Sequence, residues 1–180
     1  MVTRKILVID DERTQAEALA KIIESVIPDS HTFIASDETE IIDAVENKFY
    51  NLAILDIRMD RLSADGIAFA KRILEVNPYA RILFVSRFIP EYMTQLNPLL
   101  SNGNILGFSD KKSNYDEWKC ELRDIILPYY EKLDENPQAV STALINMYSD
   151  IKNDADKLRK GERLEDFVSL LFQSVGYSEI

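Results

Sequence analysis

Three acidic side chains follow two apolar runs of the chain, at the point where each run ends. Asp10 and Asp11 come directly after Ile6–Ile9, and Asp56 comes directly after Leu52–Leu55. Uninterrupted apolar runs of this length are typical of strands buried on both faces of a parallel sheet. The carboxyl ends of parallel strands meet at one edge of such a sheet, so we expect the three carboxylates to gather there.

The negative charges of several carboxylates at a sheet edge must be neutralised in part, because like charges repel more strongly where the dielectric constant is low. Either one carboxylate stays protonated or a divalent cation binds. Oxygen-only ligands with open positions favour Mg²⁺, which keeps waters that a phosphate can displace. Two further strand ends supply groups that bind phosphoryl oxygens, the hydroxyl of Ser86 and the ammonium of Lys111. Together these groups predict phosphoryl transfer to the carboxylate of Asp56.

Strand and helix patterns alternate five times between residue 4 and about residue 131. This alternation predicts right-handed βαβ units and therefore an α/β fold with a doubly wound, five-stranded parallel sheet. Asp37, followed by Glu40 three residues later, predicts a capping box at the start of the second helix. The expected strands are Arg4–Asp10, Thr32–Ala35, Tyr50–Asp56, Arg81–Ser86 and Asn104–Phe108.

Composition and charge argue against several classes of protein. Apolar residues make up 46% and charged residues 29% of the chain, which is typical of a globular protein. The net charge of -10 argues against a nucleic-acid surface, which needs clustered Lys and Arg. Cys120 is the only cysteine, so neither a disulfide framework nor a cysteine-based zinc site is expected. No apolar run reaches membrane-spanning length, and Asp10 comes too early for a signal peptide, so we expect a cytoplasmic protein without a membrane partner.

The motifs at the strand ends resemble the receiver domain of two-component response regulators. The matching motifs are Ile6–Glu12, Ile54–Met59 with Gly66 downstream, Phe84–Ser86 and Gly107–Lys111. They follow the order of the family, and the resemblance covers residues 1 to about 131. It implies a flavodoxin-like fold of the receiver type and a signalling switch rather than an enzyme with turnover.

The resemblance also implies a role for each residue of the acidic cluster. Asp56 would accept a phosphoryl group from a sensor histidine kinase or a phosphotransfer protein. Asp11 and Asp56 would bind Mg²⁺ directly, and the backbone carbonyl of Arg58 would be the third protein ligand. Asp10 would act on the metal through a water molecule.

Three other residues would carry the switch, again by resemblance. Lys111 would bind the phosphoryl group, and Ser86 would move toward it. Phe108 would be the aromatic residue whose rotamer follows this movement. The surface formed by the fourth helix (near Glu91–Leu100), the fifth strand and the fifth helix (Tyr115–Tyr130) would pass the state on.

The chain departs from the family pattern around the site. The loop after Asp56 lacks the usual proline after Met59, and it is longer. Arg87 stands where a small residue is usual, so its guanidinium could act as a gate that covers the phosphoryl site, or could pair with the phosphoryl group. Lys112 replaces a proline that normally has a cis bond. These departures leave open a receiver-like module that binds proteins without being phosphorylated.

Two enzyme classes are less consistent with the residues. Aspartate-nucleophile phosphatases have a similar site, but they carry a second aspartate two residues after the nucleophile, where this chain has Arg58. A dinucleotide or flavin fold is disfavoured because no glycine-rich loop follows the first strand.

The chain changes character after the polar segment Asp134–Pro137, which predicts a receiver domain over residues 1–133 and a helical extension over 134–180. Apolar residues recur at helical spacing from Val140 to Leu158, and Gly161 is expected to separate this helix from a last helix that Gly176 closes. The first stripe could form a short coiled coil that dimerises the protein, or it could pack against the fifth helix. Gly161–Tyr177 weakly resembles the opening helix of restriction-endonuclease-like domains, and any nuclease activity would then lie beyond Ile180.

Overall fold

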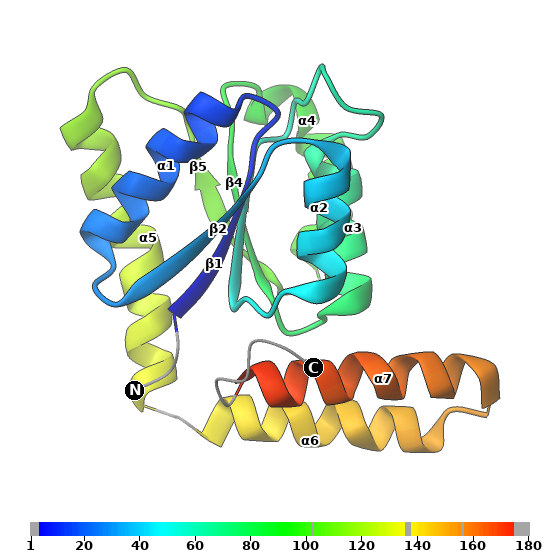
Figure 1. The fold of residues 1–180 in the computed structure, drawn as a ribbon. Coiled ribbons are helices and arrows are strands. Elements are labelled where there is room, and N and C mark those ends of the chain that lie inside the picture. The colour runs from blue at the N-terminus through cyan, green and yellow to red at the C-terminus, as the bar shows by residue number, and fades with distance from the viewer. Residues whose placement is uncertain (1–3, 102, 136–137, 156, 175–180) are drawn as a thin grey trace.

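A parallel β-sheet forms the centre of the molecule. The computed structural model describes residues 4–101, 103–135, 138–155 and 157–174. The sheet has five strands, all parallel, in the order β2-β1-β3-β4-β5 (Figure 1). The doubly wound fold expected from the sequence is thereby confirmed. The strands are β1 (Arg4–Ile9), β2 (Ser30–Ala35), β3 (Leu52–Leu55), β4 (Arg81–Val85) and β5 (Ile105–Ser109).

Helices cover both faces of this sheet (Figure 1). One face packs against α1 (Arg13–Val26) and α5 (Tyr115–Glu135). The other face packs against α2 (Glu38–Asn47), α3 (Gly66–Val76) and α4 (Ile89–Leu100). Both faces of the sheet are therefore buried, which explains the uninterrupted apolar runs Ile6–Ile9, Leu52–Leu55 and Ile82–Val85 in the central strands.

The residues of β1 show how one strand serves both cores. Ile6 and Val8 belong to the core under α1 and α5, whereas Leu7 and Ile9 belong to the core under α2, α3 and α4. All of these side chains are fully buried. Since β1 ends at Ile9, the next residue, Asp10, lies at the carboxyl edge of the sheet, where the apolar surroundings end.

The start of α2 follows the predicted capping box in part. The carboxylate of Asp37 accepts a hydrogen bond from the backbone N–H of Glu40, at 2.9 Å. The carboxylate of Glu40 accepts from the N–H of Ser36, at 2.9 Å, one residue earlier than a full capping box requires. Asp65 caps α3 in the same way, by accepting from the N–H of Ala68 at 2.8 Å.

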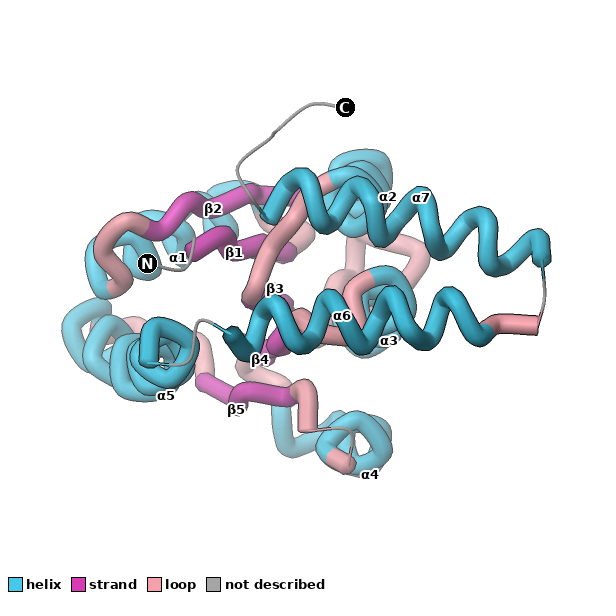
Figure 2. The backbone as a smooth tube through the Cα atoms, turned by 90° about the horizontal axis from the view of Figure 1, so that it is seen from below, coloured by secondary structure: helices cyan, strands magenta, loops and turns pink. Residues whose placement is uncertain are grey.

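The C-terminal residues form a helical hairpin, α6 (Gln138–Asn153) and α7 (Lys157–Ser174), which lies across the amino-terminal ends of the strands (Figures 1 and 2). The prediction that one helix continues to Leu158 is wrong, because the chain turns after Asn153. Gly161 lies inside α7 and does not interrupt it. The predicted cap at Gly176 lies outside the described residues.

The turn of the hairpin is held by one carboxylate. Asp154 accepts hydrogen bonds from both Nε and Nη2 of Arg159, at 2.8 and 2.7 Å, and also from Nη1 of Arg163, at 3.2 Å. The Asp154 side chain is only 3% exposed. These charge-assisted bonds explain why the helix ends here although the apolar spacing continues.

The apolar stripe of α6 packs within the chain. Met147 and Ile151 are buried against Phe167 of α7 and against Phe49 and Tyr79, which precede β3 and β4. The stripe therefore has α7 and these two loops as its partners, in place of the fifth helix considered from the sequence. None of the helices in the described ranges is both long and apolar enough to cross a membrane.

Candidate functional site

The register of the sheet brings two aspartates side by side. Ile9 pairs with Leu55, and Leu55 pairs with Phe84 on the next strand. Asp10 and Asp56 each follow one of these paired residues, so both leave the sheet at its carboxyl edge. The N–H of Asp56 also donates to the carbonyl of Ile9, at 3.0 Å, which extends the pairing to the site itself.

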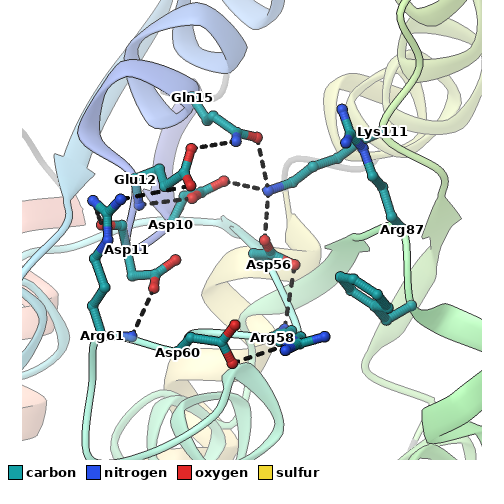
Figure 3. Close-up of a pocket in the computed structure, with 11 residues that line it drawn as sticks. Asp10, Asp11, Glu12, Gln15, Asp56, Arg58, Asp60, Arg61, Arg87 and Lys111 are labelled. Carbon is teal, nitrogen blue, oxygen red and sulfur yellow. Dashed lines mark hydrogen bonds and ion pairs between the residues drawn. The ribbon is translucent and has the colours of Figure 1, made fainter.

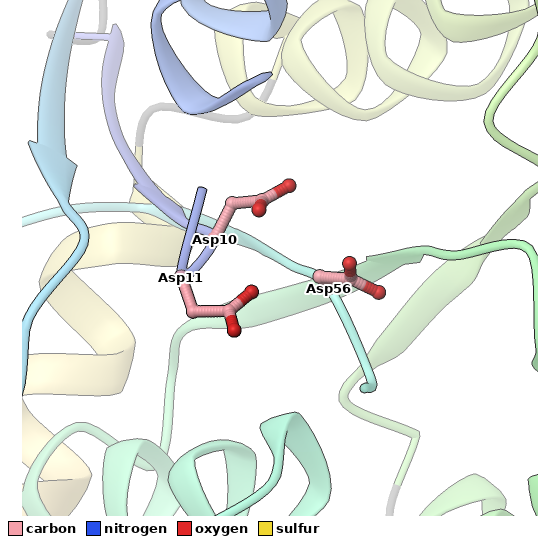
Figure 4. Close-up of side chains that lie close together, drawn as sticks. All are labelled: Asp10, Asp11 and Asp56. Atoms are coloured by element: carbon pink, nitrogen blue, oxygen red, sulfur yellow. The ribbon is translucent and has the colours of Figure 1, made fainter. Parts of the chain in front are cut away.

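The predicted acidic cluster is present (Figure 4). Each of Asp10, Asp11 and Asp56 offers a carboxylate oxygen, and these oxygens all lie within 4.8 Å of one another. Asp10 is 2% exposed and Asp56 is 9% exposed. Three carboxylate oxygens at this spacing are the donor set that a hard divalent cation such as Mg²⁺ prefers, so the residues fit the expected ion.

Lys111 balances this cluster from the other side (Figure 3). Its ammonium donates to Asp10 Oδ2 at 2.6 Å, to Asp56 Oδ2 at 2.5 Å and to Gln15 Oε1 at 3.1 Å. An ammonium has three N–H donors, so each of them has an acceptor here.

Burial and pairing act in opposite directions on the pKa values of this cluster. Burial lowers the pKa of Lys111, but the hydrogen bonds that its ammonium donates to Asp10 and Asp56 outweigh this effect, so the pKa lies above its ordinary value and the lysine stays charged. Burial raises the pKa of Asp10, and the contact with Lys111 offsets this only in part.

The segment that follows Asp56 supplies further polar contacts. The N–H of Arg58 donates to Asp56 Oδ1, at 3.3 Å. The guanidinium of Arg58 donates to Asp60, at 2.9 Å, and lies 4.8 Å from the ring centroid of Phe88. The backbone of Arg58 thus lies beside Asp56, and the metal-binding role of its carbonyl stays a prediction.

The longer loop over residues 57–65 folds back on the site. The N–H of Arg61 donates to Asp11 Oδ2, at 2.9 Å, and its guanidinium donates to the Asp11 carbonyl, at 3.4 Å. The loop closes where the N–H of Gly66 donates to the carbonyl of Ile57, at 2.8 Å. A Cβ at Gly66 would lie 1.8 Å from the carbonyl oxygen of Asp56, so this close approach requires glycine.

These side chains line a cavity of about 440 Å³ at the carboxyl edge (Figure 3). Six of its residues were expected from the sequence, namely Asp10, Asp11, Asp56, Arg58, Arg87 and Lys111. Five were not, namely Glu12, Gln15, Asp60, Arg61 and Phe88. The missed residues lie on loops or on the first turn of α1, and their only sequence signal was closeness to a predicted strand end.

The predicted switch residues lie on β5 or directly after β4. Ser86 is fully buried, and its hydroxyl accepts from the N–H of Phe88 at 3.4 Å. Phe108 is partly buried on the α4 side, with its ring stacked on Phe84 at 6.0 Å between centroids. Neither is among the described residues that line the cavity, whereas the exposed Arg87 is.

The loop after Lys111 is fixed through the residue that replaces the usual proline. The ammonium of Lys112 pairs with the carboxylate of Glu121 on α5. No cis peptide bond occurs among the described residues, so Lys111 and Lys112 are joined by a trans bond. The ion pair of Lys112 thus connects this loop to α5.

The fold and this site together define a receiver-type domain. The family model described as response regulator receiver domain matches residues 6–97. The chain therefore belongs to this family, whose members act in two-component signalling. No curated protein matches the sequence.

Solved structures support the same assignment. The response regulator domain of CheB from Thermotoga maritima is 26% identical, with a TM-score of 0.55 over 69% of this chain and 95% of that chain. A CheY-like receiver domain protein from Methanospirillum hungatei is 22% identical, with a TM-score of 0.55 over 76% and 98%. The Thermotoga maritima response regulator TrrA, solved in complex with Mg²⁺-BeF, is 24% identical, with a TM-score of 0.50 over 68% and 98%.

Proposed function

We propose that this chain is a phosphorylation-dependent switch in which Asp56 accepts a phosphoryl group from a histidine kinase or a phosphotransfer protein. The observation that carries the proposal is the position of Asp56, which lies between Lys111 and two further carboxylates at the edge of the sheet. Membership of the receiver family supports it. The domain takes part in transfer once per cycle, so we do not propose an enzyme with turnover.

The Asp56 carboxylate is the nucleophile in the proposed reaction. One oxygen forms a bond to phosphorus while the bond from phosphorus to the donor breaks, and the leaving imidazole nitrogen or carboxylate oxygen takes the electron pair. Lys111 then binds a phosphoryl oxygen in place of the carboxylate, and the Ser86 hydroxyl donates to another. Mg²⁺ held by Asp10, Asp11, Asp56 and the Arg58 carbonyl would neutralise charge on the transferred group.

The new charge has to be passed on from the site. Phosphorylation adds roughly two negative charges, and it biases an existing equilibrium only through contacts that differ between the two states. Lys111 and Ser86 make these contacts first, and the Phe108 ring responds next. We propose that the surface of α4, β5 and α5 is the output face, from which the state passes to the hairpin or to an effector.

The hairpin offers a surface for a second copy of the chain. Its buried stripe is used within the chain, so a dimer would use exposed apolar residues, namely Ile145 at 65%, Tyr148 at 47% and Leu171 at 38% exposure. Light scattering over a range of concentrations tests this. We expect the wild type to form a dimer and Ile145→Asp to be a monomer, which would support a second copy of the chain as the partner. A wild type that stays monomeric at all concentrations would contradict it.

Intact-mass spectrometry tests the phosphoacceptor directly. With acetyl phosphate and Mg²⁺, we expect one phosphoryl adduct on the wild type and none on Asp56→Asn. Asp43→Asn is the matched control, since Asp43 lies on α2 and its side chain is 57% exposed. A wild type without an adduct, or an adduct that persists on Asp56→Asn, would contradict the assignment.

A module that binds proteins without phosphorylation is the alternative that Arg87 favours, because this guanidinium lines the cavity. A Mg²⁺ titration separates the two functions. Trp118 is a suitable reporter because its indole N–H donates to Ser109, at 3.1 Å, two residues before Lys111. Saturable binding supports the switch, and we expect Arg87→Ala to speed both phosphorylation and hydrolysis. A chain that shows no Mg²⁺ binding would favour the module.

A further inference from the structure

A glutamine on the first turn of α1 contacts the lysine of the site (Figure 3). Gln15 Oε1 accepts from the Lys111 ammonium at 3.1 Å, and Gln15 Nε2 donates to Glu12 Oε2 at 2.5 Å. Glu12 is the N-cap residue of α1, yet its carboxylate makes no capping hydrogen bond. Its carboxylate instead anchors the amide of Gln15.

The chemistry of the two neighbours fixes the orientation of this amide. The ammonium of Lys111 can only donate hydrogen bonds, and the carboxylate of Glu12 can only accept them. The amide must therefore turn its oxygen to Lys111 and its nitrogen to Glu12. A flipped amide would set donor against donor and acceptor against acceptor, and neither glutamate nor methionine at position 15 could bridge the same pair.

The contact with Gln15 differs from the other two contacts of Lys111. Asp10 and Asp56 are the proposed metal site and phosphoacceptor, so their charges change when the ion binds or Asp56 is phosphorylated. The oxygen of Gln15 is neutral and lies outside this acidic cluster. It can hold the ammonium before and after transfer, without competing for the ion.

Glu12 connects this contact to the loop over residues 57–65. Its Oε1 lies 3.7 Å from the guanidinium of Arg61, and the N–H of Arg61 donates to Asp11 at 2.9 Å. The polar contacts thus run from Lys111 through α1 to the loop that follows the phosphoacceptor.

We propose that Gln15 is a positioning residue, which holds the Lys111 ammonium toward the phosphoryl site and is itself oriented by Glu12. This inference rests on the proposed function only for its kinetic consequence, because the contact itself can be tested in the metal-free chain. Loss of one such hydrogen bond corresponds to an effect of roughly threefold to tenfold.

The first measurement is the exchange of the Lys111 ammonium hydrogens in the metal-free chain of residues 1–180. Proton–nitrogen NMR of ¹⁵N-labelled lysine reports it, and Lys111→Arg assigns the signal by removing it. We expect the exchange in Gln15→Met to be at least about threefold faster than in wild type. Gln95→Met, at an exposed position of α4, is the matched control. Unchanged exchange in Gln15→Met overturns the proposal.

A swap of the two side chains guards against a variant that is simply misfolded. Gln15→Glu alone turns a carboxylate toward Glu12, so we expect faster exchange of the Lys111 hydrogens. Gln15→Glu combined with Glu12→Gln restores one donor and one acceptor at the wild-type net charge. We expect the double variant to return to within about twofold of wild type. A double variant no better than Gln15→Glu alone overturns the proposed orientation.

The kinetic consequence is measured with acetyl phosphate and Mg²⁺. We expect Gln15→Met to phosphorylate roughly threefold to tenfold more slowly, with rescue in the swapped double variant. Its Mg²⁺ affinity, followed by Trp118 fluorescence, should stay within about twofold because all three carboxylates remain. A wild type that accepts no phosphoryl group refutes the proposed function, whereas the exchange data still decide the role of Gln15. A phosphorylated wild type that Gln15→Met matches in rate refutes the positioning role alone.

Discussion

The two ends of the β-sheet are built from opposite kinds of side chain. At the carboxyl end, Lys111 and the acidic cluster form charge-assisted contacts of 2.5 and 2.6 Å. At the amino end, Met147, Ile151 and Phe167 bury apolar surface against two loops. Charge-assisted bonds depend on exact donor and acceptor positions, whereas apolar burial depends on area and varies gradually. The carboxyl end should therefore tolerate displacement poorly, and the amino end should respond in proportion to the area lost.

The largest expected effect is at Gly66, where Gly66→Ala would place a Cβ 1.8 Å from the backbone oxygen of Asp56. Backbone cannot move aside as a flexible side chain does, so we expect a loss of about 3 kcal/mol or more in the free energy of unfolding. Urea unfolding measures it. We also expect phosphorylation of Asp56 to be lost. A variant with wild-type stability would show that the loop over residues 57–65 can relax, and that the carboxyl end of the sheet tolerates displacement.

The second effect is at the amino end, where Ile151→Ala removes a side chain that is 1% exposed. We expect a loss of roughly 2–4 kcal/mol in the local stability of the hairpin. Hydrogen exchange of the α6 and α7 amides should accelerate accordingly, while the amides of β1 and β3 and the phosphorylation of Asp56 stay as in wild type. Asn146→Ala is the matched control, since Asn146 is exposed on the same helix and belongs to neither the buried stripe nor the proposed dimer surface. Equal acceleration in the central strands would mean that the two ends unfold as one unit.

The same contrast explains what could be predicted from the sequence. The strands and the acidic cluster were predictable because each apolar run ends in a polar residue, and parallel strands put such ends together. Asp10, Asp56 and Lys111 therefore meet as expected. Gln15 and Arg61 were missed because their contacts depend on the path of a loop and on a helix rotation, which no local pattern encodes.

The hairpin was harder to predict for a different physical reason. Apolar residues continue at helical spacing to Leu158, so the periodicity alone favours one longer helix. The turn is decided by Asp154, which accepts from Arg159 and Arg163 on the following helix. These residues come into contact only after the turn has formed, so the local sequence pattern does not indicate the turn. Glycine at position 161 suggested a break, but an exposed helix accommodates it at modest cost.

The third effect is a gain in stability, in contrast to the loss expected for Gly66→Ala. A Cβ at Gly161 meets no atom within 4 Å, and the residue lies inside α7. We expect Gly161→Ala to stabilise this helix by about 0.5–1 kcal/mol, because alanine loses less backbone entropy on folding. Slower hydrogen exchange of the α7 amides would show it. Gly66→Ala and Gly161→Ala thus form a matched pair, because the first should destabilise the protein and the second should stabilise it. Changes in stability of the same sign would contradict the contrast between the two ends of the sheet.

The smallest effect concerns the pair between Lys112 and Glu121, which fixes the loop after Lys111 from outside the buried cluster. Burial raises the pKa of Glu121, but the hydrogen bonds from Lys112 and Ser109 outweigh it and hold the pKa below its ordinary value of 4.5. A carboxylate with a lowered pKa stabilises the folded state above its unfolded pKa, and this contribution is lost as the pH falls through the folded value.

We therefore expect Glu121→Gln to cost about 0.5 kcal/mol at neutral pH, since both side chains of the pair are partly exposed. The difference from wild type should shrink as the pH falls below 4.5. Urea unfolding at several pH values measures it, with Glu131→Gln at an exposed position of α5 as the control. A difference that persists at low pH would assign the effect to packing of the side chain, because only an ionised carboxylate forms the pair with Lys112.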